Sequence, residues 1–372
     1  MKIISLFNNK GGVGKTTLAF HLSHILADMG HKVLIIDLDP QCNITICGID
    51  QDFLERIWRE EDPFIDDYES TCSQYGVDGL KEINSHPHSI HYLLKPTEDG
   101  TTDFSNDELP PSIQIAYNLH LIPGRLTINK YESVISERWA QAYQGSPLAI
   151  RTITRIRSIA EAYAEKDGYE YVIIDTSPSL GNLNKVIIST VDGFIIPCLP
   201  DMFSLYGIRN IGDSLTQWQK DFNTIYTLIS EEKRNKFPAK FVQFLGYTIY
   251  NARKYTRAIS NNWNLAQAHY NYAIQIPDTI NRFIVRDVRI GLSEEQIKEP
   301  IGGTAVMHSH NTTTNMAQKY RLPMWKLPDC NFLDDDDKRT ITVNKNQSYY
   351  PTKDAYRRFA NDFLARVSIL DY

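Results

Sequence analysis

Short apolar runs alternate with amphipathic segments along much of this 372-residue chain. The runs at residues 3–7 and Val33–Leu38 predict strands that are buried on both faces. Between them, residues 18–29 place apolar side chains at helical spacing, and Gly30 suits the end of that helix. This order predicts a parallel sheet with right-handed helical crossovers. We expect the second strand to lie directly beside the first.

Further apolar runs predict three more strands, at residues 171–175, 193–197 and 244–250. Near the end of the chain, residues 352–367 carry their aromatic and aliphatic side chains on one helical face. The predicted fold class is therefore α/β, with a mostly parallel twisted sheet that is flanked by helices. In such sheets ligands bind at the carboxyl ends of the strands.

Three segments fit this pattern poorly. Residues 51–118 are rich in polar and turn-forming side chains, and residues 252–280 look helical without a clean period. Residues 305–351 hold a Thr/Asn/His stretch and an acidic run at 334–337. We interpret the chain, residues 1–372, as a single domain with an insertion or decorated loop region at 51–118 and a C-terminal insertion at 305–351.

Composition narrows the class of protein. The chain is 42% hydrophobic and 23% charged, which predicts a packed globular core. It begins at a strand, and it shows neither a signal segment nor an apolar run of membrane-spanning length. We therefore expect a cytoplasmic protein without stable membrane insertion. The five scattered cysteines form no C-x-x-C pair, and the net charge of -6 leaves nucleic-acid binding to a local basic patch.

The most informative stretch is residues 8–17, which read NNKGGVGKTT directly after the first strand. Its glycines allow a tight turn in which backbone N–H groups face a phosphate chain. A lysine here can reach the β- and γ-phosphates of ATP, and the threonine after it can ligate Mg²⁺. A glycine-rich turn with two surface lysines is the bland alternative, but it does not require the flanking strand and helix. The residues expected to cradle the phosphates are Gly11, Gly12, Val13, Gly14, Lys15, Thr16 and Thr17.

Two aspartates follow strands at positions where they can join this loop. Asp39 lies in the sequence DLDPQ at the end of the second strand, where a carboxylate can orient a water or hold the hydration shell of Mg²⁺. Asp175 ends the run YVIID, which has the form of a Walker B strand, and we expect it to hold Mg²⁺. We expect Gly181 to give the loop that follows Asp175 room to move with the γ-phosphate.

The glycine loop departs from the usual P-loop pattern, because position 9 is Asn and a second lysine, Lys10, stands at its start. The form KGGxGKTT resembles the deviant P-loop of the ParA/MinD family of ATPases. This resemblance implies a homodimer in which Lys10 reaches the partner's nucleotide. It also implies that Lys10, Lys15 and Asp39 serve catalysis.

The resemblance continues through weaker segments. Residues 195–201 look like the family segment that lies near the adenine, which would place Pro200 and Asp201 at the base. Asn251 ends a strand where related ATPases place an adenine-binding Asn. The function implied is a Mg-ATP-dependent, dimerising switch for plasmid partition or cargo positioning. Such switches use nonspecific DNA and a stimulating protein partner, ParB-like or encoded in the same operon.

Two alternatives stay open. A nucleotide-gated regulatory or assembly subunit acting on a protein partner, without DNA, is favoured by the long insertions and the acidic charge. The basic side chains near the C-terminus could contact DNA phosphates or simply form solvated helix faces. These candidate DNA contacts are Arg282, Arg286, Arg289, Lys353, Arg357, Arg358 and Arg366.

Overall fold

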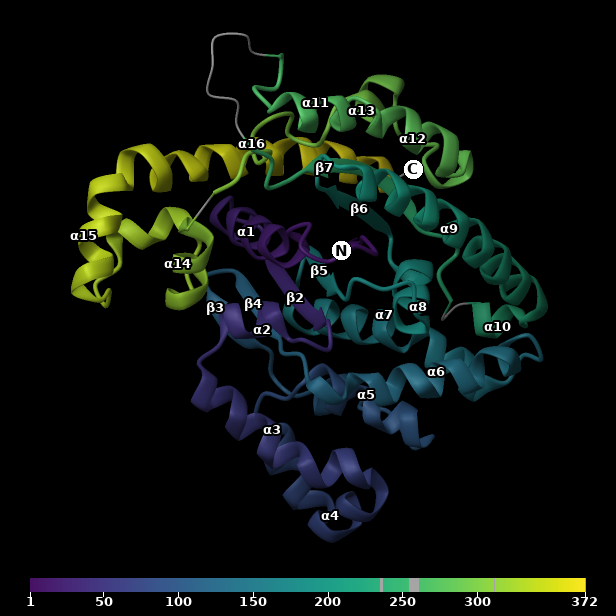
Figure 1. Ribbon diagram of the computed structural model, residues 1–372. Coiled ribbons are helices and arrows are strands. Elements are labelled where there is room, and N and C mark those ends of the chain that lie inside the picture. Colours follow the sequence, from purple (N-terminus) through teal and green to yellow (C-terminus); the bar gives the residue numbers. More distant parts are fainter. Residues whose placement is uncertain (235–236, 254–260, 311, 372) are drawn as a thin grey trace.

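The computed structural model describes residues 1–234, 237–253, 261–310 and 312–371. Within these residues, one seven-stranded sheet has the order β3-β4-β2-β5-β1-β6-β7 (Figure 1). Its neighbours are parallel except for the antiparallel pair β3–β4. The predicted α/β class is confirmed. The strands are β1 (Lys2–Leu6), β2 (Val33–Leu38), β3 (Ile113–Ala116), β4 (Leu119–Ile122), β5 (Tyr171–Thr176), β6 (Gly193–Cys198) and β7 (Gln243–Ile249).

The expected pairing of the first two strands is wrong. β2 pairs with β4 and β5, and β5 lies between β2 and β1. The helical crossover after β1 skips one position in the sheet, and the later apolar run of β5 fills it. Asp175 consequently stands in register with Leu6 on one side and with Asp37 on the other. Three strand ends that carry the predicted chemistry are thus neighbours.

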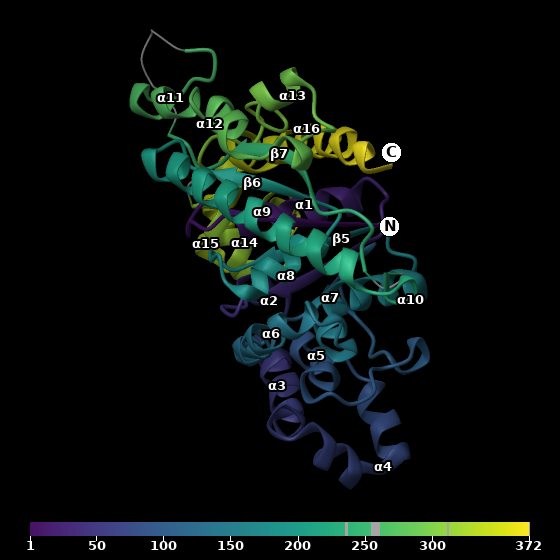
Figure 2. The ribbon, with the colours of Figure 1, turned by 90° about the vertical axis from the view of Figure 1, so that its right-hand side faces the viewer.

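Helices cover both faces of this sheet (Figures 1 and 2). They are α1 (Lys15–Asp28), α2 (Asn43–Gly48), α3 (Gln51–Asp66), α4 (Tyr68–Asn84), α5 (Ile90–Asp99), α6 (Asn129–Ala142), α7 (Pro147–Asp167), α8 (Asn182–Thr190), α9 (Met202–Leu228), α10 (Glu231–Arg234), α11 (Gln267–Ala273), α12 (Ile276–Phe283), α13 (Glu294–Lys298), α14 (Thr313–Tyr320), α15 (Asp335–Asn344) and α16 (Tyr350–Val367).

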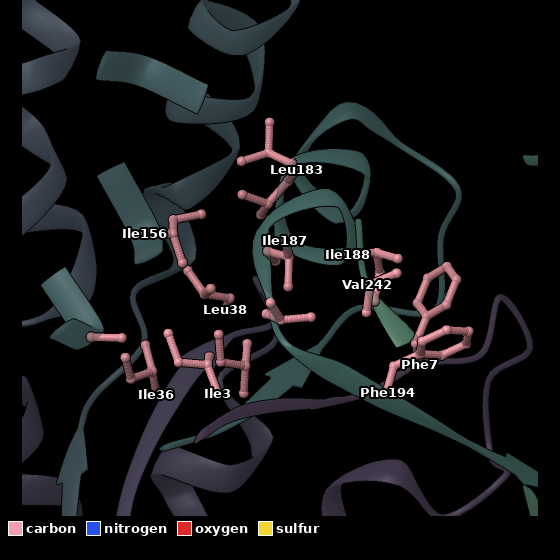
Figure 3. Close-up of a cluster of buried hydrophobic side chains, with 14 of the residues drawn as sticks. Ile3, Phe7, Ile36, Leu38, Ile156, Leu183, Ile187, Ile188, Phe194 and Val242 are labelled. Atoms are coloured by element: carbon pink, nitrogen blue, oxygen red, sulfur yellow. The ribbon is translucent and has the colours of Figure 1, made fainter. Parts of the chain in front are cut away.

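Strand alternation divides the core into two layers. Ile3 and Ile36 pack with side chains of α7, α8 and α9, as Figure 3 shows for part of this layer. Ile4 and Ile35 point to the opposite face, where they pack with α1 and α16. Each large apolar side chain that is buried in this way contributes roughly 1.5–3 kcal/mol. The central strands are buried on both faces, as their continuous apolar runs predict.

The described residues of the three poorly patterned segments are largely helical. Residues 51–118 contain α3, α4 and α5, and the first two project from the body as a hairpin (Figures 1 and 2). In contrast, Tyr92, Leu93 and Leu94 of α5 are fully buried in the core. Residues 252–280 contain α11 and part of α12, and their stretch 254–260 lies outside the described residues.

The segment 305–351 packs beside α1 and α16 through α14, α15 and a 3₁₀ segment, Met324–Asp329. Its Trp325 is buried and donates a hydrogen bond to Asp28 of α1 at 3.1 Å. In the part of the chain that the structure describes, every helix is too short or too polar to cross a membrane.

Candidate functional site

The glycine loop turns between β1 and α1 through left-handed backbone. Gly12 has φ +74°, and Gly14, the N-cap of α1, has φ +85°. These angles favour glycine, because a Cβ is strained there. At Gly14 the missing side chain also makes room for a neighbour, since a Cβ would lie 2.2 Å from the ring of Tyr250. The loop is therefore shaped both by its own backbone and by a ring from the end of β7.

This loop forms one wall of a cleft of about 610 Å³ at the carboxyl end of the sheet. The N-terminus of α1 has no side-chain cap, which leaves its first N–H groups available to an anion. The seven predicted phosphate-cradling residues all line the cleft. The remaining lining residues are Asp39, Gln41, Asn43, Cys47, Pro178, Tyr250, Asn251, Ser309, His310, Thr314 and Gln318.

Lys15 is buried beneath the loop. Its ammonium donates hydrogen bonds to the carbonyl of Asn8 at 3.0 Å and to that of Lys10 at 3.3 Å. Burial lowers the pKa of Lys15, whereas the carboxylates of Asp175 and Asp39 oppose this shift. The ammonium is thus held at the base of the cleft, between the loop and two acidic groups.

Asp37 and Asp39 have different surroundings. Asp37 is fully buried, and it accepts hydrogen bonds from the Thr45 hydroxyl at 2.6 Å and from the N–H of Asp39 at 3.1 Å. Burial raises the pKa of Asp37 to about 7. Asp39 lines the cleft and accepts a hydrogen bond from the N–H of Gln41 at 2.9 Å. Asp37 therefore fixes the shape of the loop, and Asp39 is the carboxylate that faces the cleft.

Asp175 is fully buried at the end of β5. Among the residues that the structure describes, neither of its carboxylate oxygens forms a hydrogen bond of good geometry, although the Thr16 hydroxyl lies close enough to lower its pKa. Burial raises the pKa of Asp175 to about 8, and the Asp37 carboxylate adds to this rise, while Thr16 and Lys15 oppose it. Burying a carboxylate that forms no hydrogen bond of good geometry is unfavourable unless another group interacts with it. A bound cation is one group that fits its chemistry.

Lys10 lies apart from the cleft lining. Its ammonium forms an ion pair with Asp201 and lies 5.4 Å from the ring centre of Phe203. Asp201 also caps α9 by accepting a hydrogen bond from the N–H of Ser204 at 2.9 Å. Neither Pro200 nor Asp201 lines the cleft. In this structure Asp201 of that segment holds Lys10, and its place near adenine stays a prediction.

Asn251 does line the cleft, with left-handed backbone at φ +57°. Sequence reasoning missed several of its neighbours. Tyr250 also lines the cleft, and its place next to the predicted Asn251 could have revealed it. Gln41, Asn43 and Cys47 line the cleft as well, and they follow the predicted Asp39 in the chain. Four lining residues come from the C-terminal segment, namely Ser309, His310, Thr314 and Gln318. Of these, only His310 had a signal in the sequence, the loose spacing H-x-H at 308–310, which is more typical of loop histidines than of a binding site.

This geometry defines a P-loop nucleotide-binding protein. The family model described as an AAA domain matches residues 1–228, more than half of the chain. The chain belongs to that family, and within it to the ParA/MinD-like P-loop ATPases, as the residues at 10–17 predicted.

Three known proteins illustrate the likeness. The sporulation initiation inhibitor protein Soj of Bacillus subtilis is 29% identical over 225 residues, which are 60% of this chain and 68% of that protein. The structure of pNOB8 ParA bound to nonspecific DNA has a TM-score of 0.52 at 16% identity and covers 99% of this chain and 98% of its own. A Cyanothece McdA variant in complex with ATP has a TM-score of 0.55 at 14% identity and covers 98% and 96%.

The two structural likenesses show a shared fold. Across the first four curated relatives that it matches, the chain spans between 54% and 68% of their length.

Proposed function

We propose that this protein binds Mg-ATP in the cleft and hydrolyses it to ADP and phosphate. The observation that carries the proposal is the meeting of the glycine loop, Lys15, Asp39 and Asp175 at three neighbouring strand ends. The loop N–H groups and Lys15 bind the phosphates. Asp39, the carboxylate that lines the cleft, orients the attacking water.

The residues present fit a magnesium ion. Asp175 offers a buried carboxylate that forms no hydrogen bond of good geometry among the described residues, and the Thr16 hydroxyl from the glycine loop lies close to it. These two side chains would hold Mg²⁺, with Asp39 on its hydration shell. The ion supplies positive charge that offsets the phosphates.

A homodimer across the nucleotide is the second part of the proposal. The side chain of Lys10 is 23% exposed and lies over the ring of Phe203. Three large apolar side chains are exposed at the start of α9, namely Met202, Phe203 and Tyr206. An ammonium beside such a patch suits a second copy of the chain whose nucleotide it would contact. To do so, Lys10 must leave Asp201.

We propose plasmid partition or cargo positioning as the role, with nonspecific DNA as one partner and a ParB-like or operon-encoded protein as another. A relative from Thermus thermophilus is named chromosome-partitioning ATPase Soj, and a structural neighbour is bound to nonspecific DNA. Arg282 and Arg286 are exposed and available to DNA phosphates.

Two other arginines among the candidate DNA contacts donate hydrogen bonds to backbone carbonyls of this chain. Arg366 is 1% exposed and donates to the carbonyl of Gln296 at 2.7 Å, so its assignment to a DNA-binding face is wrong. Arg289 is partly buried and donates to the carbonyl of Ile284 at 3.0 Å. The proposed DNA surface therefore rests on fewer side chains than the sequence suggested.

The projecting hairpin α3–α4 favours the alternative, a nucleotide-gated subunit that acts on a protein partner. Its exposed surface is predominantly acidic, which repels DNA and suits a basic protein. The exposed acidic side chains are Asp52, Glu55, Glu60, Asp62, Asp66, Asp67, Glu69, Asp78 and Glu82, against the basic Arg56, Arg59 and Lys81.

ATP turnover by the purified chain tests the proposal. Lys15→Ala should abolish it, whereas Lys220→Ala, on the exposed face of α9, should leave it unchanged. Wild-type turnover in the Lys15→Ala variant would refute the site. Titration of duplex DNA at low and moderate salt, with an ATP analogue, with ADP and without nucleotide, separates the two roles. Negligible DNA binding in all three states would favour the protein-partner subunit.

Light scattering with a nonhydrolysable ATP analogue tests the dimer. The wild type should double its mass, and Lys10→Ala should remain a monomer. A Lys10→Ala variant that dimerises and hydrolyses ATP normally would contradict a contact across the interface.

A further inference from the structure

Helix α8 begins without a cap of its own. Its N-cap residue is Gly181, which has no side chain to accept a hydrogen bond from the first turn. Glu132 of the neighbouring helix α6 takes this place, because its Oε1 accepts a hydrogen bond from the N–H of Leu183 at 3.3 Å. A carboxylate at a helix N-terminus is also favoured by the helix dipole. The start of α8 is thus capped from another helix.

The carboxylate is seated directly against Gly181. A Cβ at that position would lie 2.2 Å from Oε1 of Glu132, although the backbone there, with φ -72°, accepts any residue. A second tie joins the same two helices, since the side chain of Asn182 donates to the hydroxyl of Ser136 at 2.8 Å. The glycine therefore serves close approach by Glu132 rather than an unusual turn.

The loop between β5 and α8 reaches the nucleotide cleft at its other end. Pro178 lines the cleft and lies beside Gly11 of the glycine loop. A Cβ at Gly11 would lie 3.9 Å from Cγ of Pro178. From the first turn of α8, the buried side chain of Asn184 donates hydrogen bonds back into this loop, to the carbonyls of Ser177 at 2.9 Å and Ser179 at 2.8 Å. Residues 177–181 are therefore fixed between the cleft wall and α6.

We propose that Glu132 is a positioning residue for hydrolysis, which holds loop 177–181 in the place that the γ-phosphate and the attacking water require. This inference rests on the proposed ATPase function. Glu132 does not line the cleft, so it acts through the loop. A displacement of the loop by about 1 Å is enough to lower turnover by up to about a hundredfold. Nucleotide affinity depends on the glycine loop and should not change.

Four variants test the inference: Glu132→Ala, Glu132→Gln, Gly181→Ala and the double variant Glu132→Ala/Gly181→Ala. We expect Glu132→Ala to lower kcat by roughly tenfold or more while the Kd for ADP stays within about twofold. Glu132→Gln keeps an acceptor oxygen and should restore most of the turnover. Gly181→Ala displaces the carboxylate and should match Glu132→Ala.

The double variant should be no slower than Glu132→Ala alone, because the two changes remove one contact. Glu137→Gln, an exposed glutamate on the same helix, is the matched control and should behave as the wild type. Unchanged kcat in Glu132→Ala would overturn the inference. So would a loss of kcat that falls together with ADP affinity and with the folded fraction, measured by urea denaturation, since that pattern means a structural role.

The same assay separates this inference from the proposed function. A wild-type protein that binds ADP but never turns ATP over would refute the ATPase, and the positioning role with it. A wild-type protein that turns ATP over, with Glu132→Ala equally fast, would refute the positioning role alone.

Discussion

Alanine at Gly14 should destabilise the protein more than alanine at Gly12. Both positions have left-handed backbone, with φ of +85° and +74°. That conformation costs an alanine roughly 1–2 kcal/mol. At Gly12 nothing lies within 4 Å of the new Cβ, whereas at Gly14 it would lie 2.2 Å from Cδ1 and 2.5 Å from Cε1 of Tyr250. Gly12→Ala is therefore the matched control for backbone strain alone.

The clash at Gly14 adds to that strain because the Tyr250 ring has little freedom. It is 4% exposed, and its hydroxyl lies 3.3 Å from the hydroxyl of Tyr356. Overpacking of this kind costs about 1–3 kcal/mol. The free energy of unfolding should thus fall by about 1–2 kcal/mol in Gly12→Ala and by about 2–5 kcal/mol in Gly14→Ala.

Urea denaturation without nucleotide measures these values for each single variant and for Gly14→Ala combined with Tyr250→Ala. The ring truncation removes the obstacle, so the double variant should be more stable than the sum of the two single changes by about 1–3 kcal/mol. Equal losses in Gly12→Ala and Gly14→Ala, or strictly additive effects in the double variant, would refute the packing of Tyr250 on the glycine loop.

Three further predictions concern the cleft and its surroundings. Asp39→Ala should keep the affinity for an ATP analogue but stop turnover; a loss of affinity as large as in Lys15→Ala would make Asp39 a magnesium or structural residue. Asp201→Asn removes the charge that pairs with Lys10, so half-maximal dimerisation should need less ATP analogue, and an unchanged midpoint by light scattering would mean that the pair does not compete with dimerisation. Burial lowers the pKa of His21 to about 3, so the unfolded chain binds the extra proton, and stability is lost as pH falls below 6.5 by about 1.4 kcal/mol per pH unit. His21→Gln should flatten part of this dependence in urea midpoints taken from pH 7.5 to 4.5, and identical slopes would contradict it.

The strands and the glycine loop could be predicted because each has a local cause. A strand that is buried on both faces is apolar along nearly its whole length, so the strand Val33–Leu38 can be predicted from its sequence alone. The loop needs glycine where φ is positive, and this requirement places Gly12 and Gly14 before any fold is known. Asp39 and Asp175 follow from their positions after such strands.

What the sequence concealed depends on contacts between distant segments. The strand that lies between β2 and β1 is β5, which begins more than 130 residues after β2 ends, so no local pattern reveals this pairing. Arg366 reads as one charge on a polar helix face. In the structure it satisfies carbonyls at Leu245, Gln296 and Glu299, which only the packing of α16 against the sheet brings together. The spacing of residues along the sequence does not show which distant backbone carbonyls will need a hydrogen-bond donor.

The C-terminal segment shows why an apparent insertion can be part of the site. His310 lines the cleft, and its ring lies 5.9 Å from that of Tyr250 and, stacked, 5.9 Å from that of Tyr356. Tyr356 in turn stacks on His21 of α1 at 5.1 Å. The ring that supports the glycine loop is thus supported by side chains from both ends of the chain. Four residues of the segment 305–351 therefore form part of the cleft wall, namely Ser309, His310, Thr314 and Gln318, and the ring of Tyr250 lies between His310 and Gly14.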